Sequence, residues 1–142
     1  MPLKFHPEPG TLLICDYSTG FRIPEMVKKR PVVTISPRLK RRDGLITIVP
    51  LSTSAPSPVC DHHCKITVKP ALPSPFDSEE AWVKADMLAT VGFERLDLIR
   101  TGRDPFGKRK YLTRQLEPEV MQTVYQCVLH AIGLGHLTWP EK

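Results

Sequence analysis

The stretch KKRPVVTISP, from Lys28 to Pro37, is followed after a basic turn by LITIVPLST, from Leu45 to Thr53. Both stretches are nearly continuous in apolar and β-branched residues, which is typical of strands at the centre of a sheet. The turn between them contains Asp43-Gly44, a pair that favours a hairpin. If the strands are antiparallel, Arg30 at the start of the first lies beside Ser52 at the end of the second. An arginine next to a hydroxyl suits a phosphodiester ligand, because the guanidinium is planar, permanently charged and able to donate two parallel hydrogen bonds.

The size and charge of the chain restrict its class. The 142 residues are enough for one domain with its own core, and the net charge of +5 favours an anionic partner such as nucleic acid. No apolar run approaches the roughly 20 residues of a membrane span, and the N-terminus MPLKFHPEPG lacks the apolar segment of a secretion signal. The four cysteines are typical of reduced thiols in this context. We therefore expect a soluble, cytoplasmic protein whose residues 1–142 form a single domain.

The remaining sequence predicts further short strands and one helix. Strand-like patterns occur at Leu12–Tyr17, Lys65–Val68 and Ala81–Leu88. The turn residues of GRDPFGKRKY predict a hairpin. From Pro118 the apolar residues follow a helical period, and Gly133 suits the C-terminal cap. Short strands at this spacing with one terminal helix predict a small β-rich barrel.

Four segments, in this order, resemble the PemK/MazF family of toxins from bacterial toxin–antitoxin pairs. The segments are PGTLLICDY, KKRPVVTIS, ITIVPLST and WVKADMLATVGFERL; a helix ending in HAIGL follows, and the resemblance covers most of residues 9–135. Members of this family are endoribonucleases with a compact SH3-like barrel and a C-terminal helix, usually dimeric. The resemblance therefore implies a mainly β fold with one α-helix, in agreement with the patterns above.

The resemblance also implies which residues carry the chemistry. The family's arginine before the second strand falls on Arg30, and its hydroxyl falls on Ser52, with Thr53 as the adjacent candidate. A basic residue and an aspartate two positions apart, used in the PemK-like branch, fall on Lys84 and Asp86 of one predicted strand face. Lys84 stands where that branch has arginine, so the charge is kept and the bidentate fork is lost.

The implied reaction needs no metal and no cofactor. The 2′-OH of RNA attacks the adjacent phosphorus, leaving a 2′,3′-cyclic phosphate and a 5′-OH end. Arg30 would bind the phosphate, Ser52 would position it, and Asp86 is the candidate base, with Lys84 or Arg30 assisting the leaving group. The histidine that some members carry in the first loop has no counterpart between Ser18 and Lys29.

Basic and aromatic residues outside this set predict contacts along a single RNA strand. The candidates are Phe21, Arg22, Lys28, Lys29, Arg38, Lys40, Arg41 and Arg42. A third basic group runs from Arg100 to Arg114. Trp82 fits either a base-stacking position or the core.

The segment from Cys60 to Cys64, CDHHC, contains four zinc-ligand types within five residues. Five consecutive residues can hardly surround a tetrahedral ion, and the sequence has no second cluster of this kind. We therefore expect a connection between two strands and no metal site. Cys15 and Cys127 fall in a strand and a helix, where they suit small apolar positions.

These observations predict the toxin of a type II toxin–antitoxin system, a homodimeric, metal-independent endoribonuclease that cleaves single-stranded RNA at specific sequences. An acidic antitoxin is the partner that the resemblance implies. One alternative is a non-enzymatic toxin of the same fold, similar to CcdB, which inhibits DNA gyrase and for which the tail GHLTWPEK offers Trp139. Another is a catalytically silent SH3-like binding module. The motifs around Arg30 and Ser52 favour the nuclease.

Overall fold

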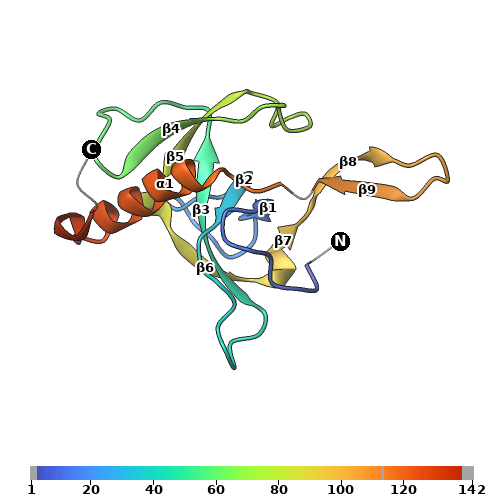
Figure 1. The fold of residues 1–142 in the computed structure, drawn as a ribbon, viewed down its shortest axis with the longest axis horizontal. Helices are drawn as coiled ribbons and strands as arrows, with labels where there is room; N and C mark the ends of the chain where they lie inside the picture. Colours follow the sequence, from blue (N-terminus) through green and yellow to red (C-terminus); the bar gives the residue numbers. More distant parts are fainter. Residues whose placement is uncertain (1–2, 113, 139–142) are drawn as a thin grey trace.

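A twisted antiparallel sheet with one helix packed against it makes up the part of the chain that the computed structural model describes, residues 3–112 and 114–138 (Figure 1). The strands are β1 (Leu12–Asp16), β2 (Lys29–Thr34), β3 (Leu45–Ser52), β4 (His63–Thr67), β5 (Glu80–Lys84), β6 (Ala89–Gly92), β7 (Leu96–Asp97), β8 (Ile99–Arg103) and β9 (Arg109–Leu112). The helices are α1 (Pro118–Ala131) and the short 3-10 turns η1 (Ala85–Met87), η2 (Phe93–Arg95) and η3 (Gly135–Leu137). The sheet has the order β4-β5-β3-β2-β1-β7, while β6 pairs with the first half of β3.

The two central strands, β2 and β3, are antiparallel neighbours, as the sequence predicts. Val32 pairs with Pro50, so the same register carried two residues further sets Arg30 opposite Ser52. On its other side Ser52 pairs with Trp82 of β5. Opposed residues of neighbouring strands point to the same face of a sheet. Arg30, Ser52 and Trp82 therefore form one row on one face.

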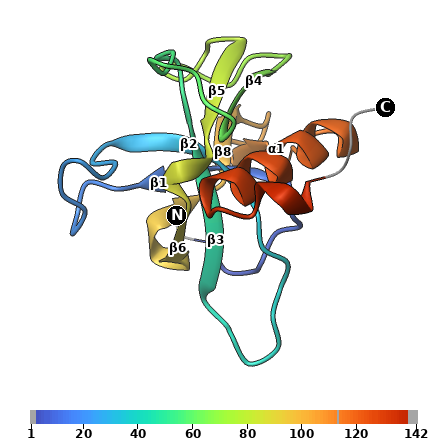
Figure 2. The ribbon, with the colours of Figure 1, turned by 90° about the vertical axis from the view of Figure 1, so that its left-hand side faces the viewer.

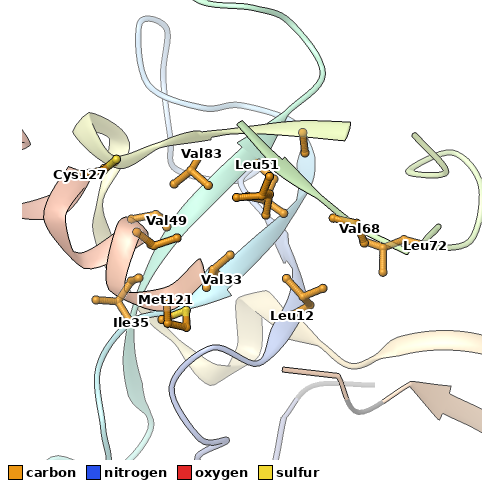
Figure 3. Packing of buried hydrophobic residues seen from close by; sticks show 14 of the residues in the cluster. Leu12, Val33, Ile35, Val49, Leu51, Val68, Leu72, Val83, Met121 and Cys127 are labelled. Carbon is orange, nitrogen blue, oxygen red and sulfur yellow. The ribbon is translucent and has the colours of Figure 1, made fainter. Parts of the chain in front are cut away.

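The main hydrophobic core lies between the sheet and α1 (Figure 3). Val33, Val49 and Val83 lie on the covered face of the sheet and have no exposed surface. The helix contributes Met121 and Cys127 to the same cluster. Burial of this apolar surface, worth about 25 cal/mol per Å², holds α1 against the sheet, where the helix lies closest to β4 and η1.

A second core lies on the opposite face of the sheet. There Val32 and Ile48 of the central hairpin pack with Val91 of β6 and Leu96 of β7. This cluster covers the first half of β3. Beyond it the same face continues toward β5, where Trp82 is half-buried and absent from both clusters.

The helix α1 begins and ends as its sequence predicts. Pro118 is its first residue, where the missing N–H of proline is no loss. Gly133 follows the helix with φ +81°. Its N–H donates to the carbonyl of His130 at 3.2 Å, and the N–H of Leu134 donates to Leu129 at 2.7 Å. This pair of bonds is the Schellman motif, in which glycine adopts the left-handed conformation most easily.

The strand predicted over residues 81–88 is shorter than expected. β5 ends at Lys84, because the chain turns into η1, where the N–H of Leu88 donates to the carbonyl of the buried Ala85 at 3.2 Å. Asp86 therefore lies on a 3-10 turn, and the prediction that Lys84 and Asp86 share one strand face is wrong.

The strand predicted at residues 65–68 begins earlier, because β4 starts at His63. His63 pairs directly with Lys84 of β5. The segment from Cys60 to Cys64 is thus only partly a connection, since its last two residues belong to the sheet. This register brings a histidine to the end of β5.

The predicted hairpin of residues 102–111 is present as β8 and β9, which project away from the sheet (Figure 1). Its turn is closed by Asp104, whose carboxylate accepts the N–H groups of Phe106 and Lys108, both at 2.9 Å. Among the described residues, no helix combines the length and apolarity needed to cross a bilayer.

Candidate active site

Arg30 lies near the start of β2 and is partly buried. Its Nε atom is buried and has no hydrogen-bond partner among the described residues. No ion pair of Arg30 occurs within that part of the chain either. A buried donor without a partner costs about 1–3 kcal/mol. Such a donor suits an anionic ligand that would complete its hydrogen bonds.

Ser52 and Thr53 end β3 next to Arg30. Ser52 is 7% exposed, and its Oγ accepts the N–H of Ser54 at 3.2 Å, which leaves its own O–H free to donate. Thr53 is exposed. A cavity of about 200 Å³ is lined by Arg30, Ser52 and Thr53 together with residues of the loop after β4 such as Phe76. The structure thus brings three of the predicted residues together at one end of the sheet.

Lys84 lies on the same face as this row, one step along β5. The register of Ser52 with Trp82 sets Lys84 opposite Pro50, diagonal to Ser52 at about 7–8 Å between Cα atoms. Lys84 is partly buried and forms no ion pair within the described residues. A second cation therefore lies close to the phosphate position that Arg30 and Ser52 suggest.

Asp86 lies between two histidines that the sequence-based prediction left out. Its Oδ2 atom is 3.8 Å from Nε2 of His62, and its Oδ1 atom is 3.8 Å from Nε2 of His63. The two imidazole rings are 4.1 Å apart, centre to centre. The backbone N–H of Cys60 donates to Nδ1 of His63 at 3.0 Å. Neutral His63 therefore carries its proton on Nε2, which faces the carboxylate.

The protonation of His63 is set by these surroundings. Burial lowers the pKa of His63, and the neighbouring His62 and Lys84 lower it further, against the opposing pull of Asp86. The His63 side chain is 8% exposed, whereas that of His62 is 27% exposed. His63 is therefore an internal neutral group, and His62 is the accessible member of the pair.

The donor atoms of Cys60, His62 and His63 lie within 4.8 Å of one another. Cys60 is exposed, however, and Nδ1 of His63 already accepts a hydrogen bond. These contacts fit a pair of histidines held against a carboxylate better than they fit a metal centre. The only signal of this pair in the sequence was the His62-His63 doublet, which pointed to no partner.

The loop between β1 and β2 lies on the side of the sheet opposite α1 (Figure 2). A cavity of about 270 Å³ separates Phe21 and Met26 of this loop from Asp86. The ring of Phe21 meets Tyr17 edge-on at 5.1 Å and has the guanidinium of Arg95 4.7 Å from its centre. Phe21 is thus already engaged by two side chains. The loop lines this cavity together with Asp86 and leads into β2, the strand that carries Arg30.

The basic residues predicted to bind RNA fall in two places. Arg22 and Lys28 belong to the β1–β2 loop, and Lys29 begins β2 directly before Arg30. Arg38, Lys40, Arg41 and Arg42 occupy the β2–β3 turn, at the opposite end of β3 from Ser52 (Figure 1). At about 3.3 Å per residue, the seven steps from Leu45 to Ser52 separate the two places by about 23 Å. The structure therefore does not bring the turn residues to Arg30.

Comparison with known proteins identifies the family of this chain. Residues 8–132 match the family described as PemK-like, MazF-like toxin of type II toxin–antitoxin system. An uncharacterized protein of Haemophilus influenzae is 28% identical over 149 residues, covering 96% of this chain and 98% of that protein. The uncharacterized protein YifN of Escherichia coli is 25% identical, covering 94% of this chain and 96% of its own length.

Solved structures share the fold. MazF from Deinococcus radiodurans superposes with a TM-score of 0.58 at 18% identity, covering 92% of this chain and 99% of that one. An endoribonuclease from a mycobacterial species gives 0.56 at 20% identity, with coverage of 94% and 95%. The predicted fold class, an SH3-like barrel of mainly β structure with a C-terminal helix, is thereby confirmed. The chain belongs to the PemK-like, MazF-like family of toxins from type II toxin–antitoxin systems.

Proposed function

We propose that this protein is a cytoplasmic toxin that cleaves single-stranded RNA without a metal, leaving 2′,3′-cyclic phosphate and 5′-OH ends. The observation that supports this most directly is Arg30, which lies on the strand next to Ser52 and whose buried Nε has no hydrogen-bond partner within residues 3–112 and 114–138. A guanidinium beside a hydroxyl is suited to hold a phosphodiester and to stabilise the negative charge that grows on it. The endoribonuclease named among the structural neighbours agrees with this chemistry.

Each predicted residue has a place in the proposed reaction. Arg30 binds the non-bridging oxygens of the phosphate, and the O–H of Ser52 positions them, with Thr53 beside it. Lys84 stabilises the charge at the leaving oxygen. The proton of the attacking 2′-OH is taken up at the Asp86 end of the site. Three of these side chains, Arg30, Ser52 and Lys84, lie on one face of the sheet, and Asp86 lies on the turn that follows β5.

The proposal includes partners. One structural neighbour is an endoribonuclease in complex with its cognate antitoxin, with a TM-score of 0.53 at 21% identity and coverage of 94% of this chain and 97% of that one. With a net charge of +5, this chain suits an acidic antitoxin that competes with RNA for the same basic surface. We propose a homodimer as the active form. Trp139, on which the gyrase-inhibitor alternative rested, lies outside the described residues.

The proposal is tested by incubating the purified protein with a long single-stranded RNA in excess EDTA. We expect discrete fragments with 5′-OH ends, and a rate reduced about 10²–10³-fold in Arg30→Ala, the loss typical of one oriented donor in such a transition state. Arg41→Ala, which removes an exposed arginine at the far end of β3, is the matched control and should retain the rate at saturating RNA. Intact RNA with the wild-type protein, or equal rates in the wild type and Arg30→Ala, would refute the proposal.

A further inference from the structure

We propose that His62 is the general base of this site and that Asp86 and His63 hold it in place. The inference rests on the proposed function, because it names the atom that takes the 2′ proton in RNA cleavage. It also replaces the simpler assignment of the Asp86 carboxylate as the base itself. The carboxylate becomes a positioning residue between two imidazoles.

The first step of the argument is the contact of both imidazoles with one carboxylate. Nε2 of His62 is 3.8 Å from Oδ2 of Asp86, and Nε2 of His63 is 3.8 Å from Oδ1. A base whose second ring nitrogen faces a carboxylate is held in one orientation and one tautomer, which is the general arrangement of an oriented catalytic histidine. Such contacts are commonly long without substrate and shorten when it binds.

The second step distinguishes the two histidines. Nδ1 of His63 accepts the backbone N–H of Cys60, and its Nε2 faces Asp86, so neither ring nitrogen is available to substrate. His62 has only Nε2 directed at Asp86, and among the described residues its Nδ1 has no hydrogen-bond partner. His62 is also the more exposed, at 27% against 8%. The free lone pair on the accessible ring is therefore Nδ1 of His62.

The third step is the position of this pair relative to the phosphate site. His63 pairs with Lys84 across β4 and β5, and Lys84 lies diagonal to Ser52 on the same face of the sheet. His62 precedes β4, and its carbonyl accepts the N–H of Ala85 at 3.3 Å, which fixes it against η1. The imidazole pair thus lies next to Lys84 and on the same side of the sheet as Arg30, three strand steps away in the order β4-β5-β3-β2, or about 14 Å between the strands themselves.

The reaction then balances as follows. The 2′-OH gives its proton to Nδ1 of His62 while its oxygen forms a bond to phosphorus. The bond from phosphorus to O5′ breaks, the electron pair leaves with O5′, and Lys84 supplies the proton that this oxygen takes up. Water removes the proton from His62 and returns one to Lys84. Arg30 holds the charge on the phosphate throughout.

Several charged and titratable groups face His62. Asp86 of η1 and the His63 ring lie against it, and the Cys60 thiol lies within 4.8 Å of its donor nitrogen. Lys84 of β5 acts on the neighbouring His63, and Asp61 precedes His62 in the chain. Imidazole is the side chain whose ordinary titration falls between pH 5 and 8. A carboxylate base would titrate near pH 4. The pH dependence of cleavage therefore separates the two assignments.

The test measures cleavage rates in EDTA from pH 4 to 9 at saturating RNA. For the wild type we expect the rate to fall on the acidic side within the general range of an imidazole base, about pH 5 to 8. His62→Gln should lower the plateau about 10²–10⁴-fold, the usual contribution of a general base, and abolish this acidic limb. Arg30→Ala should lower the rate and keep the limb, and His136→Gln, in the exposed η3 turn, should change neither.

A second variant excludes a merely structural effect. His62→Ala should regain activity when imidazole is added to the buffer, whereas Arg30→Ala should not respond to imidazole. An acidic limb near pH 4 that persists in His62→Gln would overturn the assignment and leave RNA cleavage standing. Activity that EDTA removes and zinc restores would also overturn it, in favour of a metal at Cys60 and the histidines. Absence of cleavage by the wild type would overturn the proposed function and this inference together.

Discussion

At the scale of single residues, the chemistry of this chain depends on which polar atoms the fold leaves without partners. The buried Nε of Arg30 has no hydrogen-bond partner in the described part of the chain. Arg95, by contrast, donates to the carbonyl of Thr19 at 2.6 Å and lies over Phe21. The first arginine is therefore ready for a ligand, and the second ties a loop to the sheet. Residue type alone does not distinguish these two roles.

His63 gives a prediction at this scale that does not depend on activity. Burial lowers the pKa of His63 below its ordinary value of 6.5, so below that pH the unfolded chain takes up a proton that the folded protein resists. The free energy of unfolding should therefore decrease as the pH falls from about 7 through 6.5, until the lower pKa of the folded state is passed. Urea unfolding of the wild type and of His63→Asn between pH 5 and 7.5 measures this.

The variant His63→Asn retains an acceptor for the N–H of Cys60, so it removes the titration with little change in the local hydrogen bonds. It should show a weaker pH dependence than the wild type. His136→Gln serves as the control and should behave like the wild type. An identical pH dependence in all three proteins would show that His63 is not held neutral by the fold.

At the scale of elements, the pattern of apolar residues predicted most strands and the helix, but not where each strand ends. β5 ends at Lys84 because Ala85 is buried and begins a 3-10 turn, a choice made by packing against α1. β4 begins at His63 because it pairs with β5. Alternation within one segment contains no information about either partner.

The packing of α1 gives a prediction at this scale. Val124 has no exposed surface and lies in the core between the helix and the sheet. Val124→Ala should lower the free energy of unfolding by about 2 kcal/mol, because it removes buried methyl groups and leaves a cavity. Gln122→Ala, on the exposed side of the same helix, should change it by less than about 0.5 kcal/mol. Chemical denaturation measures both, and equal effects would contradict the described packing.

At the scale of the whole molecule, two groups of positive charge lie at opposite ends of β3. Arg30 and Lys84 lie near Ser52, while Arg38 to Arg42 lie at the other end (Figure 1). A short RNA bound at Arg30 would need to run along the sheet to reach the turn. We therefore expect the turn arginines to affect RNA affinity alone, and the group at Arg30 to affect the cleavage rate.

This separation predicts how RNA binding responds to salt. Replacing Arg38, Arg41 and Arg42 by glutamine should lower the slope of log affinity against log salt by about 2, since each contact to a single strand contributes about 0.7. The cleavage rate at saturating RNA should be unchanged. Lys69→Gln is the control, because the ammonium of Lys69 already pairs with Glu79 at 3.6 Å. This variant should keep the slope of the wild type. Titration of a fluorescent RNA at several salt concentrations provides the measurement, and an unchanged slope would place the turn outside the RNA path.

The sequence by itself determined the central hairpin and therefore the pairing of Arg30 with Ser52. Residues 35–44 join the two strands. Their register follows from the apolar pattern of the strands themselves, because a slip by one residue would turn every side chain to the other face, and in this register the two side chains meet. Only the tertiary structure decided that His62 and His63 lie against Asp86. Their contact depends on the pairing of β4 with β5 and on the turn after Lys84, both of which are set by packing between segments far apart in the chain.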